Sequence, residues 1–420
     1  MQRAERNIRQ PAEERPAEGL RLALFSGNYN YTRDGSNQAL NRLAAYLIEA
    51  GATVRVYSPT TDTPAFEPAG DLVSAPSVAI PGRSEYRLAL GLTPGLKADL
   101  AAFQPTMIHL SAPDLLGSQA GRWGRAAGLP VVASLHTRFE TYLSYYGFEW
   151  LRPAAERYLD RFYRGCDRVL APNAPIADLL REQGLGERVR VWGRGVDRNR
   201  FSPDRKDMDW RRSLGIADHE IVVAFLGRLV MEKGLDMLAE TLALLGDQPI
   251  RPLIIGDGPA RAFLEARAPD AILTGHLDGD ALGRAVSSAD ILFNPSLTEA
   301  FGNASLEGMA AGLAVVCPRA PSTSALISDG QDGVLAPRPD AQSYAAAIRG
   351  LIAEPLRRLR IGRTARASSA AYDWRAICAD VLDVYRELGA APAAAARPPL
   401  RRPRLAALAV QRDAAGLRDA

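Results

Sequence analysis

Short strand-like runs alternate with amphipathic segments along most of the chain. Residues 20–26 (LRLALFS) predict a buried strand, and residues 38–50 predict an amphipathic helix that ends at Gly51, a residue suited to a helix C-terminus. Residues 53–57 complete a strand–helix–strand unit. The rhythm continues with further predicted strands at 106–110, 131–135, 169–171 and 189–192.

The same pattern starts again after a polar segment, residues 201–212, which contains Pro203. A helix is predicted at 235–245, and strands are predicted at 221–226, 252–255, 272–273, 291–293 and 314–316. Strands that alternate with helices predict a parallel sheet with helices on both faces, built twice. We therefore predict an α/β protein with two Rossmann-like doubly wound domains that face each other across a cleft.

The pattern also divides the chain into parts. We predict a disordered leader at 1–19, a first Rossmann-like domain at 20–200, a linker at 201–213 and a second Rossmann-like domain at 214–371. Residues 372–389 predict an amphipathic helix that crosses back to the first domain. The Ala-, Pro- and Arg-rich residues 390–420 predict a disordered basic tail.

Charge and cysteine content exclude several classes of protein. The net charge of the 420 residues is +3, and the tail after Gly389 holds six arginines against two aspartates, so the folded body is near neutral. A near-neutral body argues against a nucleic-acid-binding protein. The three cysteines, Cys166, Cys317 and Cys378, lie far apart without a CxxC pair, which predicts core residues in a reducing compartment and no metal site.

Membrane signals are sparse. Residues 1–19 are polar, and no apolar stretch approaches the roughly 18 residues that span a bilayer. We expect a cytoplasmic protein, and peripheral contact with the inner face of the membrane stays open. Residues 139–150 are rich in aromatic side chains, and four arginines follow, which indicates either a lipid-facing surface or a packed helix with a solvated basic face. These arginines are Arg152, Arg157, Arg161 and Arg164.

Residues 299–307 (EAFGNASLE) carry the strongest chemical signal. They follow a predicted strand and open a helix, so free N–H groups and the positive end of the helix dipole suit a phosphate there. Glu299 precedes the helix and can accept hydrogen bonds from sugar hydroxyls. Glu307 lies one turn inside, where it suits a ribose diol or, more simply, complements the helix dipole.

This segment, with its flanking NPSLT and GMAAG, resembles the Glu-x7-Glu motif of family 4 glycosyltransferases, which are retaining enzymes of the GT-B fold. The resemblance covers about 20–388. It implies that Glu299 contacts the donor sugar and Glu307 the ribose. It also implies that the amides around 302–305 hold the sugar and the distal phosphate. The donor-binding residues of this segment would be Phe301, Gly302, Asn303 and Ala304.

Two cations flank a second loop. Arg228 and Lys233 lie in GRLVMEKG, directly after a predicted buried strand, where they can balance a diphosphate and stabilise charge on a departing phosphate. The simpler interpretation is a solvated charged loop. The family carries the same pattern, and the resemblance assigns both residues to diphosphate binding and catalysis.

Three further positions match the family. His136 ends a predicted strand and corresponds to the family's active-site histidine, although a lone histidine is more often a packed or exposed residue. Gly35 lies in a loop that resembles the glycine loop with which the family closes over the donor. In this chain the loop is longer than the usual one and richer in Asn and Tyr. Arg194 lies in WGRGVD, residues 192–197, which resembles the interdomain segment of the mannosyl, glucosyl and sulfoquinovosyl transferases. The resemblance implies that Arg194 helps to bind the donor or braces the hinge, and the simpler interpretation is a structural turn capped by Asp197.

Two other motifs resemble sites of a different chemistry. GDGP at 256–259 lacks the third glycine of a dinucleotide site, because Arg261 occupies that position, so hydride transfer is not supported. A loop that lies beside a phosphate or a base stays open as an alternative. The sequence DGD at 278–280 looks like a metal-binding motif, but a helix is predicted from Ala281, which makes Asp280 a helix N-cap. We therefore expect no metal and no cofactor, because Arg228, Lys233 and the helix dipole supply the positive charge.

The resemblance implies a hexosyltransferase with an N-terminal acceptor domain and a C-terminal nucleotide-sugar domain. The expected donor is a GDP- or UDP-sugar, with ADP also open, and the expected acceptor is a lipid or a cell-envelope glycan. No third carboxylate stands as a nucleophile, which favours attack on the same face of the sugar as the departing phosphate. The alternatives are a nucleotide-sugar-binding module without transfer activity and a nucleotide-sugar 2-epimerase on the same fold.

Overall fold

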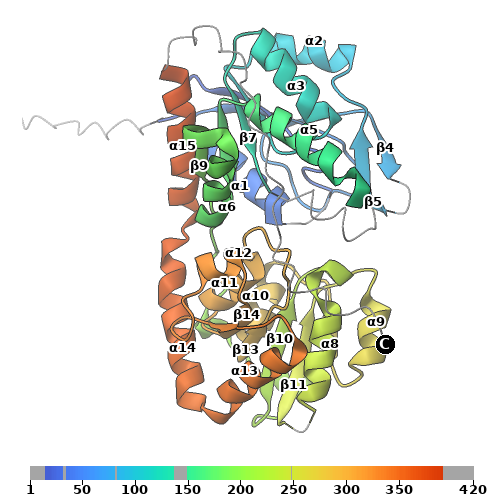
Figure 1. The fold of residues 1–420 in the computed structure, drawn as a ribbon, viewed down its shortest axis with the longest axis vertical. Helices are drawn as coiled ribbons and strands as arrows, with labels where there is room; N and C mark the ends of the chain where they lie inside the picture. The colour runs from blue at the N-terminus through green and yellow to red at the C-terminus, as the bar shows by residue number, and fades with distance from the viewer. Residues whose placement is uncertain (1–14, 32–34, 81–82, 137–148, 247, 391–420) are drawn as a thin grey trace, which may run out of the picture. The chain divides into compact units, whose positions relative to one another are not determined.

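Two sheets, each flanked by helices, form the framework of the protein (Figure 1). The structure is a computed structural model that describes residues 15–31, 35–80, 83–136, 149–246 and 248–390. The larger sheet has seven strands in the order β3-β2-β1-β6-β7-β8-β9. Their bounds are β1 Arg21–Phe25, β2 Thr53–Ser58, β3 Asp71–Ser74, β6 Met107–Leu110, β7 Val131–Ser134, β8 Arg168–Ala171 and β9 Val189–Val191.

The smaller sheet has six strands in the order β12-β11-β10-β13-β14-β15, and each neighbouring pair is parallel. The bounds are β10 Ile221–Leu226, β11 Ile250–Ile255, β12 Ile272–Gly275, β13 Ile291–Phe293, β14 Ala314–Pro318 and β15 Val334–Ala336. In both sheets the strand order reverses beside the first strand, between β1 and β6 and between β10 and β13. Ligands of open parallel sheets bind beyond the carboxyl ends of the strands at such a reversal.

The described residues divide into two compact units. The described residues of the first unit are 15–31, 35–80, 83–134, 165–167 and 378–390, and those of the second are 135–136, 149–164, 168–246 and 248–377. The predicted domain boundaries stay a prediction. Residues 1–14 of the predicted leader and 391–420 of the predicted tail lie outside the described residues. Arg15–Gly19 form a turn in which Ala17 is buried and its amide donates to the Ala50 carbonyl at 2.9 Å.

In the first unit, helices α1 (Gly35–Glu49), α2 (Pro94–Phe103) and α3 (Leu115–Ala126) connect the parallel strands. An antiparallel hairpin of β4 (Ser77–Ile80) and β5 (Arg83–Ala89) was not predicted. Its Val78 and Leu88 pair with each other and stay exposed, so it lacks the continuous apolar run of a buried strand.

A buried polar cluster joins distant parts of the first unit. His109 on β6 is fully buried, and its two ring nitrogens hydrogen-bond to the hydroxyls of Ser134 and Tyr385. Tyr385 lies on α15 (Trp374–Ala390), the red helix in Figure 1. Burial lowers the pKa of His109 to about 3, so the ring is neutral at physiological pH.

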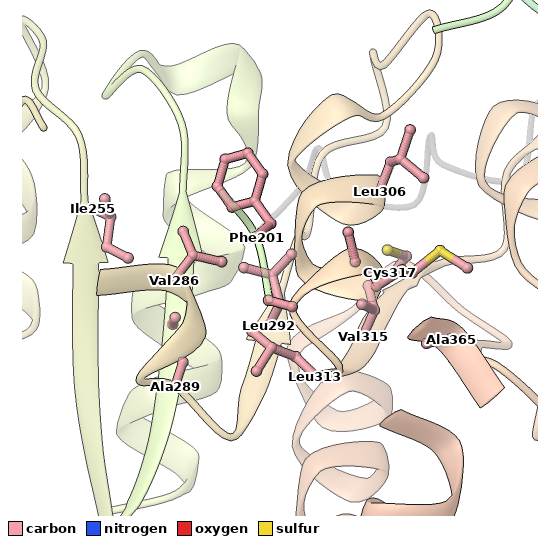
Figure 2. Packing of buried hydrophobic residues seen from close by; sticks show 14 of the residues in the cluster. Phe201, Ile255, Val286, Ala289, Leu292, Leu306, Leu313, Val315, Cys317 and Ala365 are labelled. Atoms are coloured by element: carbon pink, nitrogen blue, oxygen red, sulfur yellow. The ribbon is translucent and has the colours of Figure 1, made fainter. Parts of the chain in front are cut away.

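In the second unit, apolar side chains pack on both faces of the six-stranded sheet. Val222 and Ala224 of β10 belong to one buried cluster, and Val223 and Phe225 belong to another, because successive side chains of a strand point to opposite faces. Figure 2 shows the first cluster, which includes Cys317. The helices that contribute side chains to the first cluster include α10 (Gly279–Ser287), α11 (Asn303–Ala310) and α14 (Pro355–Ser368). Those that contribute to the second include α8 (Leu235–Leu244), α9 (Arg261–Arg267) and α13 (Ala341–Ala353).

The polar segment 201–212 is more ordered than its composition predicts. It contains all but the last residue of α7 (Met208–Ser213), and Arg211 is buried, with Nη1 3.1 Å from Oδ2 of Asp290. Burial by itself would raise the pKa of Asp290, but Lys206, the Val222 amide and Arg211 hold it below its usual value. An ion pair with this many partners can be buried without leaving a charge uncompensated.

The contact between Gly362 and Gly312 gives a test of this packing. A Cβ atom at Gly362 on α14 would lie 2.1 Å from the Gly312 carbonyl oxygen. We expect Gly362→Ala to lower the free energy of unfolding by about 1–3 kcal/mol, because the helix has to shift. Urea denaturation measures this, and Gly350→Ala on α13 is the matched control. A Cβ atom at Gly350 would meet only Nη1 of Arg357, at the ordinary contact distance of 3.6 Å, so a loss there of the same size would contradict the steric explanation.

Candidate functional site

Two motifs that are distant in sequence meet at one edge of the six-stranded sheet. Lys233 follows β10 and Glu299 follows β13, and these strands are parallel neighbours. Nζ of Lys233 lies 2.7 Å from Oε1 of Glu299, and both side chains are partly buried. The reversal of strand order between β10 and β13 therefore brings a cation and a carboxylate together where this fold class binds ligands.

The Glu299 loop is anchored on both sides. The Thr298 hydroxyl donates to the Glu232 carbonyl at 3.0 Å, which ties the loop to the turn that carries Lys233. Nδ2 of Asn294 donates to Oγ of Ser305 at 3.0 Å, and this bond links the end of β13 to α11. Ser305 also contacts Sγ of Cys317 at 3.3 Å, and burial raises the pKa of that thiol to about 12, so it stays protonated.

Helix α11 begins beside this ion pair. Gly302 precedes it with φ 99°, a left-handed conformation that favours glycine, and Asn303 is the first helical residue rather than the cap. The first N–H groups of a helix have no partners within the helix and carry its positive dipole end. Oδ1 of Asn303 is buried and has no hydrogen-bond partner within the described part of the chain. Such an atom needs a partner, and a ligand hydroxyl would supply one.

The remaining predicted donor residues of this unit lie on the same structural elements. Nη2 of Arg228 is 3.9 Å from Oε1 of Glu232, across the turn Met231–Lys233 that also presents Lys233. Glu307 is half-buried on α11, one turn after Asn303. Phe301 is buried and packs edge-on against Tyr372, with ring centroids 6.0 Å apart. Ala304 follows Asn303 in the first turn of α11.

His136 and Arg194 form a second cluster in this unit. His136 follows β7 and Arg194 follows β9, and Nη2 of Arg194 lies 2.7 Å from Nδ1 of His136. The Trp192 ring contacts both: its centroid is 5.4 Å from that of His136 and 4.9 Å from Cζ of Arg194. Arg194 is 3% exposed, so it lies within the fold and not on a solvated loop.

Two contacts connect this cluster with the Glu299 loop. Nδ2 of Asn173, the N-cap of α6 (Ala174–Leu180), donates to the Ala300 carbonyl at 2.7 Å. A Cβ atom built on Gly193 would lie 3.8 Å from Cε2 of Phe301. Asn173 was not predicted as a site residue. Its position before Pro175 marks a helix start, but nothing in the sequence indicates that it also holds a loop 127 residues away.

Gly35 and the aromatic stretch at 139–150 were also predicted as functional features. Gly35 belongs to the first unit, where it is the first residue of α1, and the preceding 32–34 lie outside the described residues. Residues 137–148 of the aromatic stretch also lie outside them. Trp150 is exposed, and Arg152 on α5 (Arg152–Arg164) pairs with Glu149 and Glu156. No helix of the described chain has both the length and the apolar character of a membrane span.

The structure describes both the GDGP motif at 256–259 and the DGD motif at 278–280, and it corrects the prediction for Asp280 in the second. The Asp257 carboxylate accepts the Gly258 amide at 2.8 Å, which closes the GDG turn on itself. Asp280 is not the helix N-cap that the sequence predicted. Helix α10 begins at Gly279, because Asp278 takes the N-cap position, and Asp280 pairs with Arg205 at 2.9 Å from the first turn. Within the described ranges, no three His, Cys, Asp or Glu side chains come together in a way that could hold a metal ion.

Family comparisons match most of the chain. The family Glycosyltransferase Family 4 matches residues 33–200, and the family Glycosyl transferases group 1 matches residues 220–354. The GDP-mannose-dependent alpha-mannosyltransferase of Mycolicibacterium smegmatis is 31% identical over 87% of this chain and 97% of that protein. Sulfoquinovosyl transferase SQD2 of Arabidopsis thaliana is 31% identical over 85% of this chain and 71% of that protein. The alpha-monoglucosyldiacylglycerol synthase of Streptococcus pneumoniae is 27% identical over 75% of each.

Solved structures agree on the fold. The sucrose-phosphate synthase of Thermosynechococcus elongatus superposes with a TM-score of 0.71 at 20% identity, covering 87% of this chain and 98% of that one. With the two Rossmann-like parallel sheets, this likeness confirms the predicted GT-B fold. The relatives also confirm that the chain is a hexosyltransferase. The roles of the individual site residues stay predictions.

Proposed function

Since this chain belongs to glycosyltransferase family 4, we propose that it transfers a hexose of the mannose or glucose type from a nucleotide diphosphate sugar, with retention, to a lipid or cell-envelope glycan. The contact between Lys233 and Glu299 carries the proposal. It places a group suited to phosphate beside a group suited to sugar hydroxyls, with Nζ of Lys233 2.7 Å from Oε1 of Glu299, and a sugar phosphate needs both kinds of group next to each other.

In the proposed complex, the diphosphate lies between Arg228, Lys233 and the first amides of α11. The guanidinium of Arg228, the ammonium of Lys233 and the helix N-terminus together offset the two negative charges of a diphosphate. Their stabilising effect grows as the bond to the sugar breaks, because negative charge then develops on the departing phosphate. These groups supply positive charge from the protein itself, and we therefore expect transfer without an added metal ion.

The sugar and the ribose lie on either side of the diphosphate. Glu299 accepts hydrogen bonds from the hydroxyls of the transferred sugar, and Oδ1 of Asn303 gains from a sugar hydroxyl the partner that it lacks within the described chain. Glu307, one helical turn further, binds the ribose diol. Because Oδ1 of Asn303 is paired only when a sugar is bound, we expect the site to discriminate against ligands that lack the sugar.

The proposed reaction breaks the bond between the anomeric carbon and the distal phosphate oxygen. The acceptor hydroxyl attacks the anomeric carbon from the same face, and its proton passes to the departing phosphate oxygen, so the anomeric configuration is retained. The names of two relatives include GDP-mannose and diacylglycerol, which supports a GDP- or UDP-sugar as donor and a lipid as acceptor. A lipid acceptor places the reaction at the inner surface of a membrane.

A thermal-shift panel tests the donor site. GDP, UDP and ADP are each added at millimolar concentration to the wild type and to Lys233→Ala. We expect one nucleotide at about 100 times its Kd to add roughly 2.7 kcal/mol to the free energy of unfolding, and we expect Lys233→Ala to lose most of this gain. Lys97→Ala, a lysine change at an exposed position in the first unit, is the control. If no nucleotide stabilises the wild type, the proposed donor site is wrong.

A further inference from the structure

We propose that Arg194 is a positioning residue that fixes the tautomer of His136, so that His136 meets the donor as a hydrogen-bond donor through Nε2. The part that concerns the donor rests on the function proposed above. The part that concerns the tautomer rests on the geometry of the protein alone.

The chemistry of the two side chains determines the direction of their hydrogen bond. A guanidinium has five N–H donors and no acceptor. Nη2 of Arg194 lies 2.7 Å from Nδ1 of His136, so Arg194 donates and Nδ1 accepts with its lone pair. A neutral imidazole with an unprotonated Nδ1 carries its proton on Nε2. Protonation of Nδ1 would break this bond and bring two cations together.

The guanidinium of Arg194 is itself held in place. Its Nη1 donates to the carbonyls of Trp192 at 3.1 Å and Gly193 at 2.9 Å, and its Cζ lies 4.9 Å from the centroid of the Trp192 ring. The planar group therefore has a fixed orientation, with two bonds to the main chain on one side and the imidazole on the other. Arg194 is 3% exposed, so few water molecules can compete for its own N–H donors.

The cluster lies against the donor-binding segment. Gly193 is next to the Phe301 ring, and Asn173 holds the Ala300 carbonyl, so the segment after β9 and the Glu299 loop share one environment. A histidine whose Nδ1 is occupied cannot use that nitrogen as a base. It can offer only the Nε2 proton, which suits an oxygen atom of the donor and leaves the acceptor proton to the departing phosphate.

The tautomer can be measured without any substrate. Side-chain ¹⁵N spectra of protein labelled at histidine distinguish an unprotonated Nδ1 from a protonated one, and His136→Gln identifies the His136 signals among the four histidines. We expect the neutral Nε2–H form of His136 at pH 7 in the wild type. A dominant Nδ1–H form, or a doubly protonated ring, would overturn the proposal whatever the enzyme transfers.

Kinetics separate positioning from donor binding. We expect Arg194→Met to lower kcat roughly 10-fold to 100-fold while the KM for the nucleotide sugar changes less than about 2-fold, because only the orientation of His136 is lost. Arg194→Lys keeps a donor for Nδ1 and should recover both the Nε2–H form and part of kcat. Arg198→Met is the matched control, since Arg198 donates to the Arg366 carbonyl at 3.1 Å.

The outcomes distinguish the effect of Arg194 on the His136 tautomer from the role of His136 in sugar transfer. If Arg194→Met leaves the His136 tautomer unchanged, or if Arg198→Met lowers kcat as much, Arg194 has no positioning role. If Arg194→Met weakens the binding of the free nucleoside diphosphate as strongly as Lys233→Ala does, Arg194 contacts the donor directly and the positioning role is wrong. If the tautomer changes as expected but no variant affects transfer, the geometry stands and the proposed role of His136 in transfer fails.

Discussion

Glu299→Gln is expected to lower the rate of sugar transfer by about 10²- to 10³-fold and, at the same time, to strengthen the binding of the free nucleoside diphosphate. Glu299 forms an ion pair with Lys233 at 2.7 Å, so part of the ammonium's charge is engaged before any ligand binds. The neutral amide releases Lys233 to the diphosphate but binds the sugar hydroxyls less strongly. Titration calorimetry with the nucleotide from the thermal-shift panel measures the first effect. Transfer of labelled hexose to phosphatidylcholine vesicles that contain diacylglycerol or phosphatidylinositol measures the second.

Two further variants make this result specific. Lys233→Ala should weaken nucleotide binding and transfer together, because it removes the cation from both steps. Glu354→Gln changes a carboxylate that pairs with Arg357 at 3.2 Å at the start of α14, and neither quantity should respond. A loss of nucleotide affinity in Glu299→Gln would mean that the ion pair is needed to hold Lys233 in place. The expected competition between Glu299 and the diphosphate for Lys233 would then be wrong.

The second large effect concerns acid stability. The wild type is expected to lose about 3 kcal/mol of its free energy of unfolding through His109 alone as the pH falls from 7 to 4. Burial lowers the pKa of His109 to about 3 in the folded protein, against 6.5 as its ordinary value. Between these values the unfolded chain binds one more proton than the folded one. The stability is therefore fully present above pH 6.5 and is lost as the pH falls towards 3.

His109→Gln removes this titration and keeps hydrogen-bonding groups for the cluster. Urea denaturation at pH 4, 5, 6 and 7, followed by far-UV circular dichroism, should show a smaller loss between pH 7 and pH 4 in the variant than in the wild type. A constant destabilisation by the substitution cancels in this comparison. His219→Gln, at an exposed position, is the control. Equal pH dependence in wild type and His109→Gln would show that the ring is not buried as a neutral group.

The regular framework of the protein was readable in the sequence because parallel strands are buried on both faces. Residues 221–226 are uniformly apolar and become β10 with the predicted bounds. The hairpin of β4 and β5 gave no such signal, because its strands lack a long apolar run and its paired Val78 and Leu88 stay exposed. The segment around Arg211 looked like a linker, because a buried ion pair and a solvated charge are identical in sequence.

The candidate site was predicted as separate motifs, and the structure adds their contacts. Lys233 and Glu299 were each named from a local pattern, and the order of β10 and β13 brings them together. The bond between Arg194 and His136 spans 58 residues, and the bond between Asn173 and Ala300 spans 127. Such pairings depend on how the loops after the strands are arranged, and no local pattern in the chain encodes them.

The pairing of His109 with Tyr385 has a consequence for biosynthesis. The two residues are 276 positions apart. A ribosome adds roughly 5–20 residues per second, so a nascent chain carries β6 for about 15–55 s before its hydrogen-bonding partner on α15 emerges. During that interval the sheet that is made first lacks the helix whose Tyr385 pairs with His109. A premature stop near the end of the message would thus damage the part of the protein that was synthesised first.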